Sequence, residues 1–197
     1  NAVEDVKVPD VTDEAWCNNP IDRFVRAKQE AKQLTPAKSA DRTTLARRLY
    51  FDLLGLPPTP EQVAAFRDDK RPDAYPRLVE QLLASPRFGE RMAVYWLDLV
   101  RFANSVGYHG DQEHAIDPYR SYVITAFNNN LPFDQFTREQ LAGDLLEDPT
   151  VDQMIATGYN RLLQTSHEGG VQQKEYLTKY AADRVRNLSS VWMGATM

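Results

Sequence analysis

The chain has 197 residues, of which 42% are hydrophobic and 26% charged, with a formal net charge of −5 and a pI near 5.3. This length is enough for one large or two small soluble domains, and an acidic chain with scattered basic residues argues against a nucleic-acid surface. No apolar run approaches the roughly 18 residues that a membrane-spanning helix needs, and the single cysteine, Cys17, excludes an internal disulfide.

Residues 1–15 are acidic and lack helical periodicity, so we expect an extended lead-in or linker there. From residue 16 onward, helix-start signals and helical periodicity recur, without strand alternation or an internal repeat. The sequence therefore predicts a single all-α domain of eight or nine helices over residues 16–197. The start signals are Asn19-Pro20, Asp41, Thr59-Pro60, Ala74, Ser85-Pro86, Asp117-Pro118, Pro132 and Thr150.

The last predicted helix runs from Val171 to the end of the chain. Its apolar stripe comprises Leu177, Ala181, Val185, Leu188, Trp192 and Ala195. The helix has no evident C-terminal cap, from which we expect a fragment of a longer chain, truncated at its C-terminus. The chain also begins with Asn rather than Met, which would fit the removal of a signal peptide.

The most informative stretch is residues 85–114, a helix that is apolar almost all round followed by a loop with Gly and His. Such a helix is normally buried. We therefore expect Asp98 and Arg101, three residues apart on one face, to be buried charges beside a polar loop. They either form an ion pair that fixes helix packing or line a pocket as weak catalytic candidates.

Two loops carry further candidate site residues. In the first, His109, Asp111 and His114 either bind a ligand or form a solvated loop, since their spacing matches no standard metal pattern. In the second, His167-Glu168 precedes two glycines and is either a catalytic dyad or part of a loop that packs on a neighbouring domain. Arg120 is a further ligand-binding candidate, and no metal site is predicted.

The sequence lacks the motifs of the common enzyme classes. Ser/His/Asp triads, Walker loops, GxGxxG, HExxH and CxxC are all absent. Their absence removes most common enzyme classes from consideration. Two acids, Asp144 on an apolar stretch and Asp183 in the middle of the last helix, are instead candidates for buried polar anchors between helices.

A long ordered pattern begins with RTTLARRLYFDLLGLPPTPEQVAAF at residues 42–66 and continues through residues 82–108, 118–146, 155–161 and 168–185. This pattern resembles a domain of unknown function found in large secreted Planctomycete cytochrome-c-like proteins. The chain departs from it where Asp117-Pro118 precedes Tyr119, a place that usually holds Trp, and where Asn104 stands for Asp. A family pocket that depends on carboxylates would be altered here.

The resemblance implies a Cys-x-x-Cys-His segment, the haem c attachment signal, shortly after Trp192–Thr196 in the full-length protein. It implies no cofactor within this chain and no catalytic residue. Its expected partners are neighbouring domains of the same polypeptide, one of them a cytochrome domain. The expected location is periplasmic or extracellular.

Three functions remain open. The first is a non-catalytic helical module of an exported c-type cytochrome-like protein, supporting electron transfer or assembly. The second is an enzyme that acts oxidatively or hydrolytically on polysaccharides, which needs the two loops to converge on a pocket. The third is a protein-interaction domain that docks through its final helix, which must then be exposed and apolar on one side.

Overall fold

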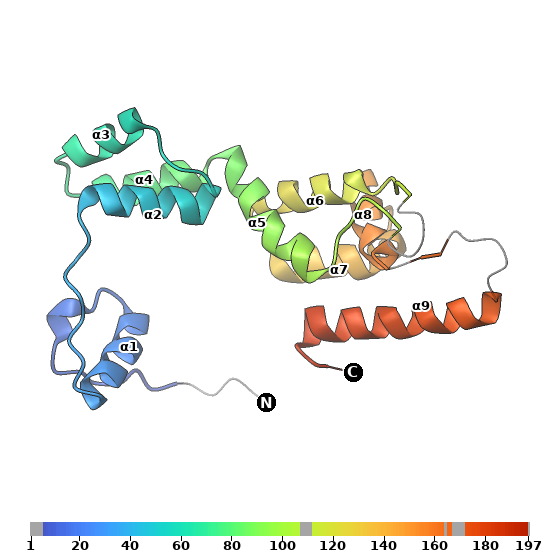
Figure 1. Ribbon diagram of the computed structural model, residues 1–197, viewed down its shortest axis with the longest axis horizontal. Helices are drawn as coiled ribbons and strands as arrows, with labels where there is room; N and C mark the ends of the chain where they lie inside the picture. Colours follow the sequence, from blue (N-terminus) through green and yellow to red (C-terminus); the bar gives the residue numbers. More distant parts are fainter. Residues whose placement is uncertain (1–5, 107–111, 164, 167–171, 197) are drawn as a thin grey trace. The chain divides into compact units, whose positions relative to one another are not determined.

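The computed structural model describes residues 6–106, 112–163, 165–166 and 172–196. These residues form nine α-helices and an isolated bridge between Ser105 and Glu113, with no strand among them (Figure 1). The prediction of an all-α fold is confirmed. The chain divides into two compact units, residues 1–41 and 42–197. A single domain over residues 16–197 stays a prediction, because each unit is defined by its own internal contacts.

The first unit contains one α-helix, α1 (Pro20–Ala31), preceded by the 3-10 turn Glu14–Trp16. The predicted start of α1 is confirmed, because Asn19 caps it in a reciprocal capping box. The segment before it is tied to the helix through Glu30, whose carboxylate accepts the backbone N–H groups of Thr12 and Asp13 at 3.1 Å. These bonds, that from Thr12 first, lower the pKa of Glu30. Cys17 is a free thiol in this unit.

The second unit begins with three helices that share a small core: α2 (Arg42–Leu54), α3 (Pro60–Asp68) and α4 (Ala74–Leu83). Gly55 ends α2 with a left-handed φ of 71°, as a helix-terminal glycine does. Thr59 starts α3 in the predicted capping box. The buried residues of this core are Ala46, Tyr50, Phe66, Ala74, Leu78 and Leu82.

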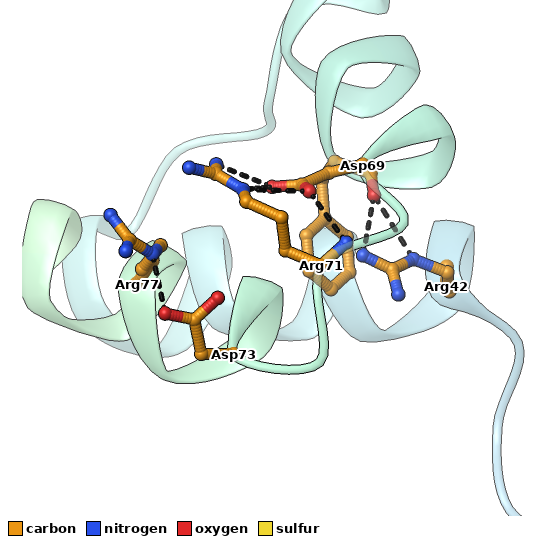
Figure 2. A network of polar contacts seen from close by, with 6 residues as sticks. Arg42, Asp69, Arg71, Asp73 and Arg77 are labelled. Atoms are coloured by element: carbon orange, nitrogen blue, oxygen red, sulfur yellow. Dashed lines mark hydrogen bonds and ion pairs between the residues drawn. The ribbon is translucent and has the colours of Figure 1, made fainter.

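Polar contacts fix the turn between α3 and α4 (Figure 2). The Arg71 guanidinium donates to the Asp69 carboxylate, with 2.6 Å between Nη2 and Oδ2, and the Arg71 backbone N–H adds a bond of 3.0 Å. Arg71 lowers the pKa of Asp69 to about 2. Arg42 donates twice to the Phe66 carbonyl, at 3.0 and 2.7 Å, and its guanidinium lies 4.2 Å from the centre of the Phe66 ring. The end of α3 is thereby held to the start of α2.

The larger core is built by α5 (Pro86–Leu99), α6 (Asp117–Asn128), α7 (Phe133–Ala142) and α8 (Val151–Ala156), with 3-10 turns at Gly143–Leu145 and Thr157–Arg161. The last helix, α9 (Gln173–Leu188), continues as a π-helical turn, Ser189–Met193. The buried residues of this core are Ala93, Trp96, Val100, Ile116, Tyr119, Tyr122, Val123, Ala126, Phe136, Ala156, Tyr159 and Leu162.

A buried polar network lies at the centre of this core. The Trp96 indole N–H donates to the hydroxyl of Tyr119 at 3.1 Å and to Oε1 of Gln140 at 3.0 Å. The Tyr119 hydroxyl donates to the same Gln140 oxygen at 2.6 Å, and burial raises the pKa of Tyr119. The Trp96 ring meets Phe136 and Trp192 edge-on, at centroid distances of 4.9 and 5.0 Å. The network therefore joins α5, α6 and α7 to the turn after α9.

Helices α5 and α6 approach each other closely at Gly89. A Cβ atom there would lie 2.4 Å from the carbonyl oxygen of Ile124. The side chain of Asn128 bridges the two helices, because it accepts from the Gly89 N–H at 2.8 Å and donates to the Pro86 carbonyl at 3.0 Å. Only glycine leaves room for this contact.

Two sequence-based expectations are wrong. Helix α5 is not buried all round, because Val94, Tyr95 and Leu99 are exposed. The last helix is not uncapped, because Gly194 adopts a left-handed φ of 60° and the Ala195 N–H donates to the Ser189 carbonyl at 3.0 Å. Ser85 does cap α5, as predicted, by accepting from the Arg87 N–H.

Candidate functional site

The two charges singled out near the end of α5 are neither buried nor paired with each other in the part of the chain that the structure describes. Asp98 is exposed, and Arg101 lies beyond the end of the helix and is exposed too. Arg101 instead forms a two-pronged ion pair with Asp183 of α9, with Nη1–Oδ1 and Nη2–Oδ2 distances of 3.0 Å. The prediction of buried charge in α5 is therefore wrong, because the charged face of the helix points to solvent.

Arg101 occupies an unusual backbone position. Its φ is 61°, in the left-handed region that a non-glycine residue enters at a cost of roughly 1–2 kcal/mol. The N–H of Phe102 donates to the Leu97 carbonyl at 2.8 Å and that of Arg101 to the Asp98 carbonyl at 3.0 Å, a Schellman-type helix end where glycine is usual. The conformation aims the guanidinium at Asp183, and this ion pair offsets part of the strain.

A cavity of about 140 Å³ brings two of the predicted residues together. Arg101 and His114 line it, along with Ser105 and Arg161, and apolar residues complete its wall. Two guanidinium groups and an imidazole line this basic cavity, although the Arg101 guanidinium is already paired with Asp183. Such donors make the cavity suited to an anion. Its apolar lining comprises Ala103, Val106, Ile116, Leu162 and Leu163.

The remaining candidates do not join this cavity within the described residues. Arg120 is exposed on α6 and is not among the residues that line it. The other four fall outside the described residues: His109, Asp111, His167 and Glu168. Among the residues placed by the structure, no three His, Cys, Asp or Glu side chains are arranged to hold a metal ion.

The two candidate loops are neighbours where the structure describes them. The Thr165 N–H donates to the Val106 carbonyl at 3.1 Å, which links the second loop to the first. The first loop is itself closed by the bridge between Ser105 and Glu113. In the second loop, the Ser166 N–H donates to the Tyr180 hydroxyl of α9 at 2.8 Å. The described ends of both loops therefore meet beside the middle of α9.

One face of α9 is anchored to the core. Asp183 pairs with Arg101, and Asn187 accepts from the Tyr159 hydroxyl at 2.6 Å. Asn187 also donates to the Val100 carbonyl at 3.3 Å. Asp183 thus serves as the predicted polar anchor, whereas Asp144 is exposed and the same prediction for it is wrong.

A different face of α9 carries an exposed apolar stripe, which we call the α9 stripe: Leu177, Ala181, Val185 and Leu188. These residues follow one another at intervals of four, four and three, so they lie on one side of the helix. The side chain of Leu177 is 60% exposed and that of Val185 is 53% exposed. The predicted stripe is therefore confirmed only for its first four residues, which face solvent within this chain, whereas Trp192 packs against the core.

The family comparison covers α1 and the whole of the second unit. A family described as "PSCyt2: Protein of unknown function (DUF1549)" matches residues 20–197. The chain belongs to the DUF1549 family. A search of curated proteins and a search of solved structures each found no match. The link to Planctomycete cytochrome-c-like proteins thus rests on the sequence resemblance.

Two site residues of the DUF1549 domain were missed by sequence reasoning, Arg161 of the basic cavity and Glu139 of α7. Glu139 is buried three residues after the core residue Phe136, on the same helix face. A glutamate at core spacing was the available signal, although most helical glutamates are solvated. In the described part of this domain, every helix is too short or too polar to cross a bilayer.

Proposed function

We propose that this DUF1549 domain is a non-catalytic helical module of a larger exported c-type cytochrome-like protein, and that it docks on a haem-bearing neighbour domain through the α9 stripe. The exposure of that stripe is the observation that carries the proposal. It joins two of the functions left open by the sequence, because docking through the last helix is how such a module would support assembly or electron transfer.

The stripe has the properties of a helix-docking surface. Residues at intervals of three and four present one apolar face that packs against another helix or into a groove. Burying a Leu or Val side chain contributes about 1.5–3 kcal/mol, so three such residues stabilise an interface appreciably. Asp183 and Asn187 bind the core from a different face of α9, so the α9 stripe stays exposed to solvent. The helix is therefore presented to a partner without having to rearrange.

The haem part of the proposal rests on the resemblance. The resemblance implies a covalently bound haem c close in sequence to the end of α9 in the full-length protein, and a periplasmic or extracellular location. The Trp192 ring packs against Trp96 and Tyr159 at centroid distances of 5.0 and 5.7 Å. A segment that follows this turn would thus leave from a rigid part of the domain.

The test uses the full-length protein and has two readouts. A Soret absorption band and a mass increase for covalent haem are expected; their absence would refute the haem part. Val185→Asp is expected to increase cleavage of the interdomain segments in limited proteolysis, because a charge on the stripe opposes docking. Thr178→Asp, at an exposed polar position of α9, is the matched control. Equal proteolysis of both variants and the parent would refute docking through the stripe.

The meeting of the two loops favours a second candidate, an enzyme that acts on polysaccharides. The bond between Thr165 and Val106 places the loops together, and Arg101 and His114 line one cavity. Its test is the release of reducing ends or oxidised sugars from acidic polysaccharides. We expect His114→Ala to abolish that release without unfolding the protein; release unchanged by His114→Ala would contradict this site.

A further inference from the structure

Helix α7 carries a buried carboxylate whose charge has no cationic partner among the described residues. Glu139 is only 5% exposed. Its Oε2 accepts from the Tyr122 hydroxyl at 2.8 Å, and its Oε1 accepts from the side-chain amides of Gln135 and Gln153 at 2.8 and 3.3 Å. All three donors are neutral. Burying a carboxylate is unfavourable unless its charge is compensated, so neutral donors alone leave the site incomplete.

Glu139 lines a cavity of about 460 Å³ between α6, α7 and α8. The volume lies within the range of pockets that hold small organic ligands. Hydroxyl and amide groups surround the carboxylate, and a second carboxylate, that of Asp152, also lines the cavity. The polar lining comprises Ser121, Tyr122, Thr125, Asn129, Gln135, Glu139, Thr150, Asp152 and Gln153, and it contains no Lys, Arg or His.

The Tyr122 hydroxyl keeps its proton in this setting. Burial, followed by the hydrogen bond to Glu139 and the charge of that carboxylate, raises the pKa of Tyr122. The hydroxyl therefore stays a donor and holds the carboxylate in place at the cavity wall. Part of the remaining wall is apolar, from Pro118, Ala126, Leu131 and Ile155, which suits a ligand with a carbon skeleton.

We propose that this cavity binds a small hydroxylated amine, such as an amino sugar, whose ammonium group pairs with Glu139. The ammonium supplies the missing positive charge, and the amide and hydroxyl side chains match the hydroxyl groups of the ligand. An anion would face two carboxylates. A metal ion would lack ligands, because no three acidic, His or Cys side chains of the described residues are grouped for one. The basic cavity at Arg101 has the opposite charge, so the two would not compete.

The experiment is isothermal titration of the intact protein with glucosamine, and with glucose as the uncharged counterpart. Glucosamine is expected to bind at least about 10-fold more tightly than glucose, which is the usual effect of one charge-assisted hydrogen bond. Equal binding of the two would make the cavity a neutral sugar site and overturn the amine assignment. Absence of glucosamine binding by the folded protein at millimolar concentration would overturn the site altogether.

Three variants assign the binding to the cavity. Glu139→Gln keeps the shape of the side chain and is expected to weaken glucosamine binding about 10-fold or more. Asp152→Asn removes the second carboxylate of the cavity at an exposed position, where folding does not depend on the side chain. It is expected to weaken glucosamine binding too. Glu90→Gln, on exposed α5 surface, is the matched control and should bind as the parent does. Unchanged binding by both cavity variants would refute the proposal.

Discussion

The close approach of α5 and α6 makes a sharp prediction for Gly89→Ala. In an exposed helix interior, replacing Gly by Ala stabilises a protein by about 1 kcal/mol. At Gly89 the added Cβ would lie 2.4 Å from the Ile124 carbonyl oxygen and 2.5 Å from Cγ of Asn128. Overpacking of this kind costs about 1–3 kcal/mol, and separating the helices also weakens the hydrogen bond from Gly89 to Asn128, worth about 1 kcal/mol.

The balance of these effects is a net loss. We expect Gly89→Ala to lower the free energy of unfolding by about 1–3 kcal/mol, since a backbone carbonyl cannot move aside as a side chain can. This corresponds to a fall in Tm of about 2–12 °C for a chain of this size. The assay is urea unfolding followed by far-ultraviolet circular dichroism, with thermal unfolding as a second measure.

A second variant identifies the atom responsible. Asn128→Ala removes the side-chain contact but leaves the Ile124 carbonyl in place, so Gly89→Ala should still destabilise in that background. Gly158→Ala is the control, because its Cβ would lie 3.1 Å from Cβ of Tyr119, and a smaller loss is expected. If Gly89→Ala were as stable as the parent or more so, the helices would not approach as closely as the structure indicates.

Two further predictions concern polar contacts. Gln140→Leu should lower the free energy of unfolding by about 1–3 kcal/mol, because the Trp96 N–H and the Tyr119 hydroxyl lose a shared buried acceptor. Thermal unfolding measures this loss, and a Tm equal to that of the parent would contradict it. The pKa of Asp69 is about 2 in the folded protein, below its ordinary value of 3.8, so its contact with Arg71 stabilises the fold above about pH 4 and that contribution disappears as the pH falls through 2. Urea unfolding of the parent and Asp69→Asn should therefore differ at pH 5 and converge below pH 2, and a constant difference would refute the assignment.

Local signals were the most reliable part of the sequence-based prediction. The capping boxes at Thr59 and Thr150 and the caps at Asn19 and Ser85 all form as expected. Each depends on residues within one helical turn, so its outcome is decided by the chain itself. The same holds for Gly55, which ends α2 by adopting a left-handed conformation.

The site residues could not be paired from sequence, because their partners are far away along the chain. Arg101 binds Asp183, 82 residues later, and not Asp98 on its own helix. Helical periodicity locates an apolar face but does not say which part of it another helix covers, so α5 was expected to be more buried than it is. The burial of Glu139 could not be predicted for the same reason, since it depends on α6 and α8 together.

The contact between Trp96 and Trp192 gives a spectroscopic signal for the position of the turn after α9. The chain has three tryptophans, and these two lie edge-on at a centroid distance of 5.0 Å while Trp16 belongs to the first unit. Two indoles this close couple their electronic transitions and produce an exciton couplet in circular dichroism. The couplet would vanish if the turn after α9 left the core, even with every helix intact, so detachment of that turn can be followed without a label.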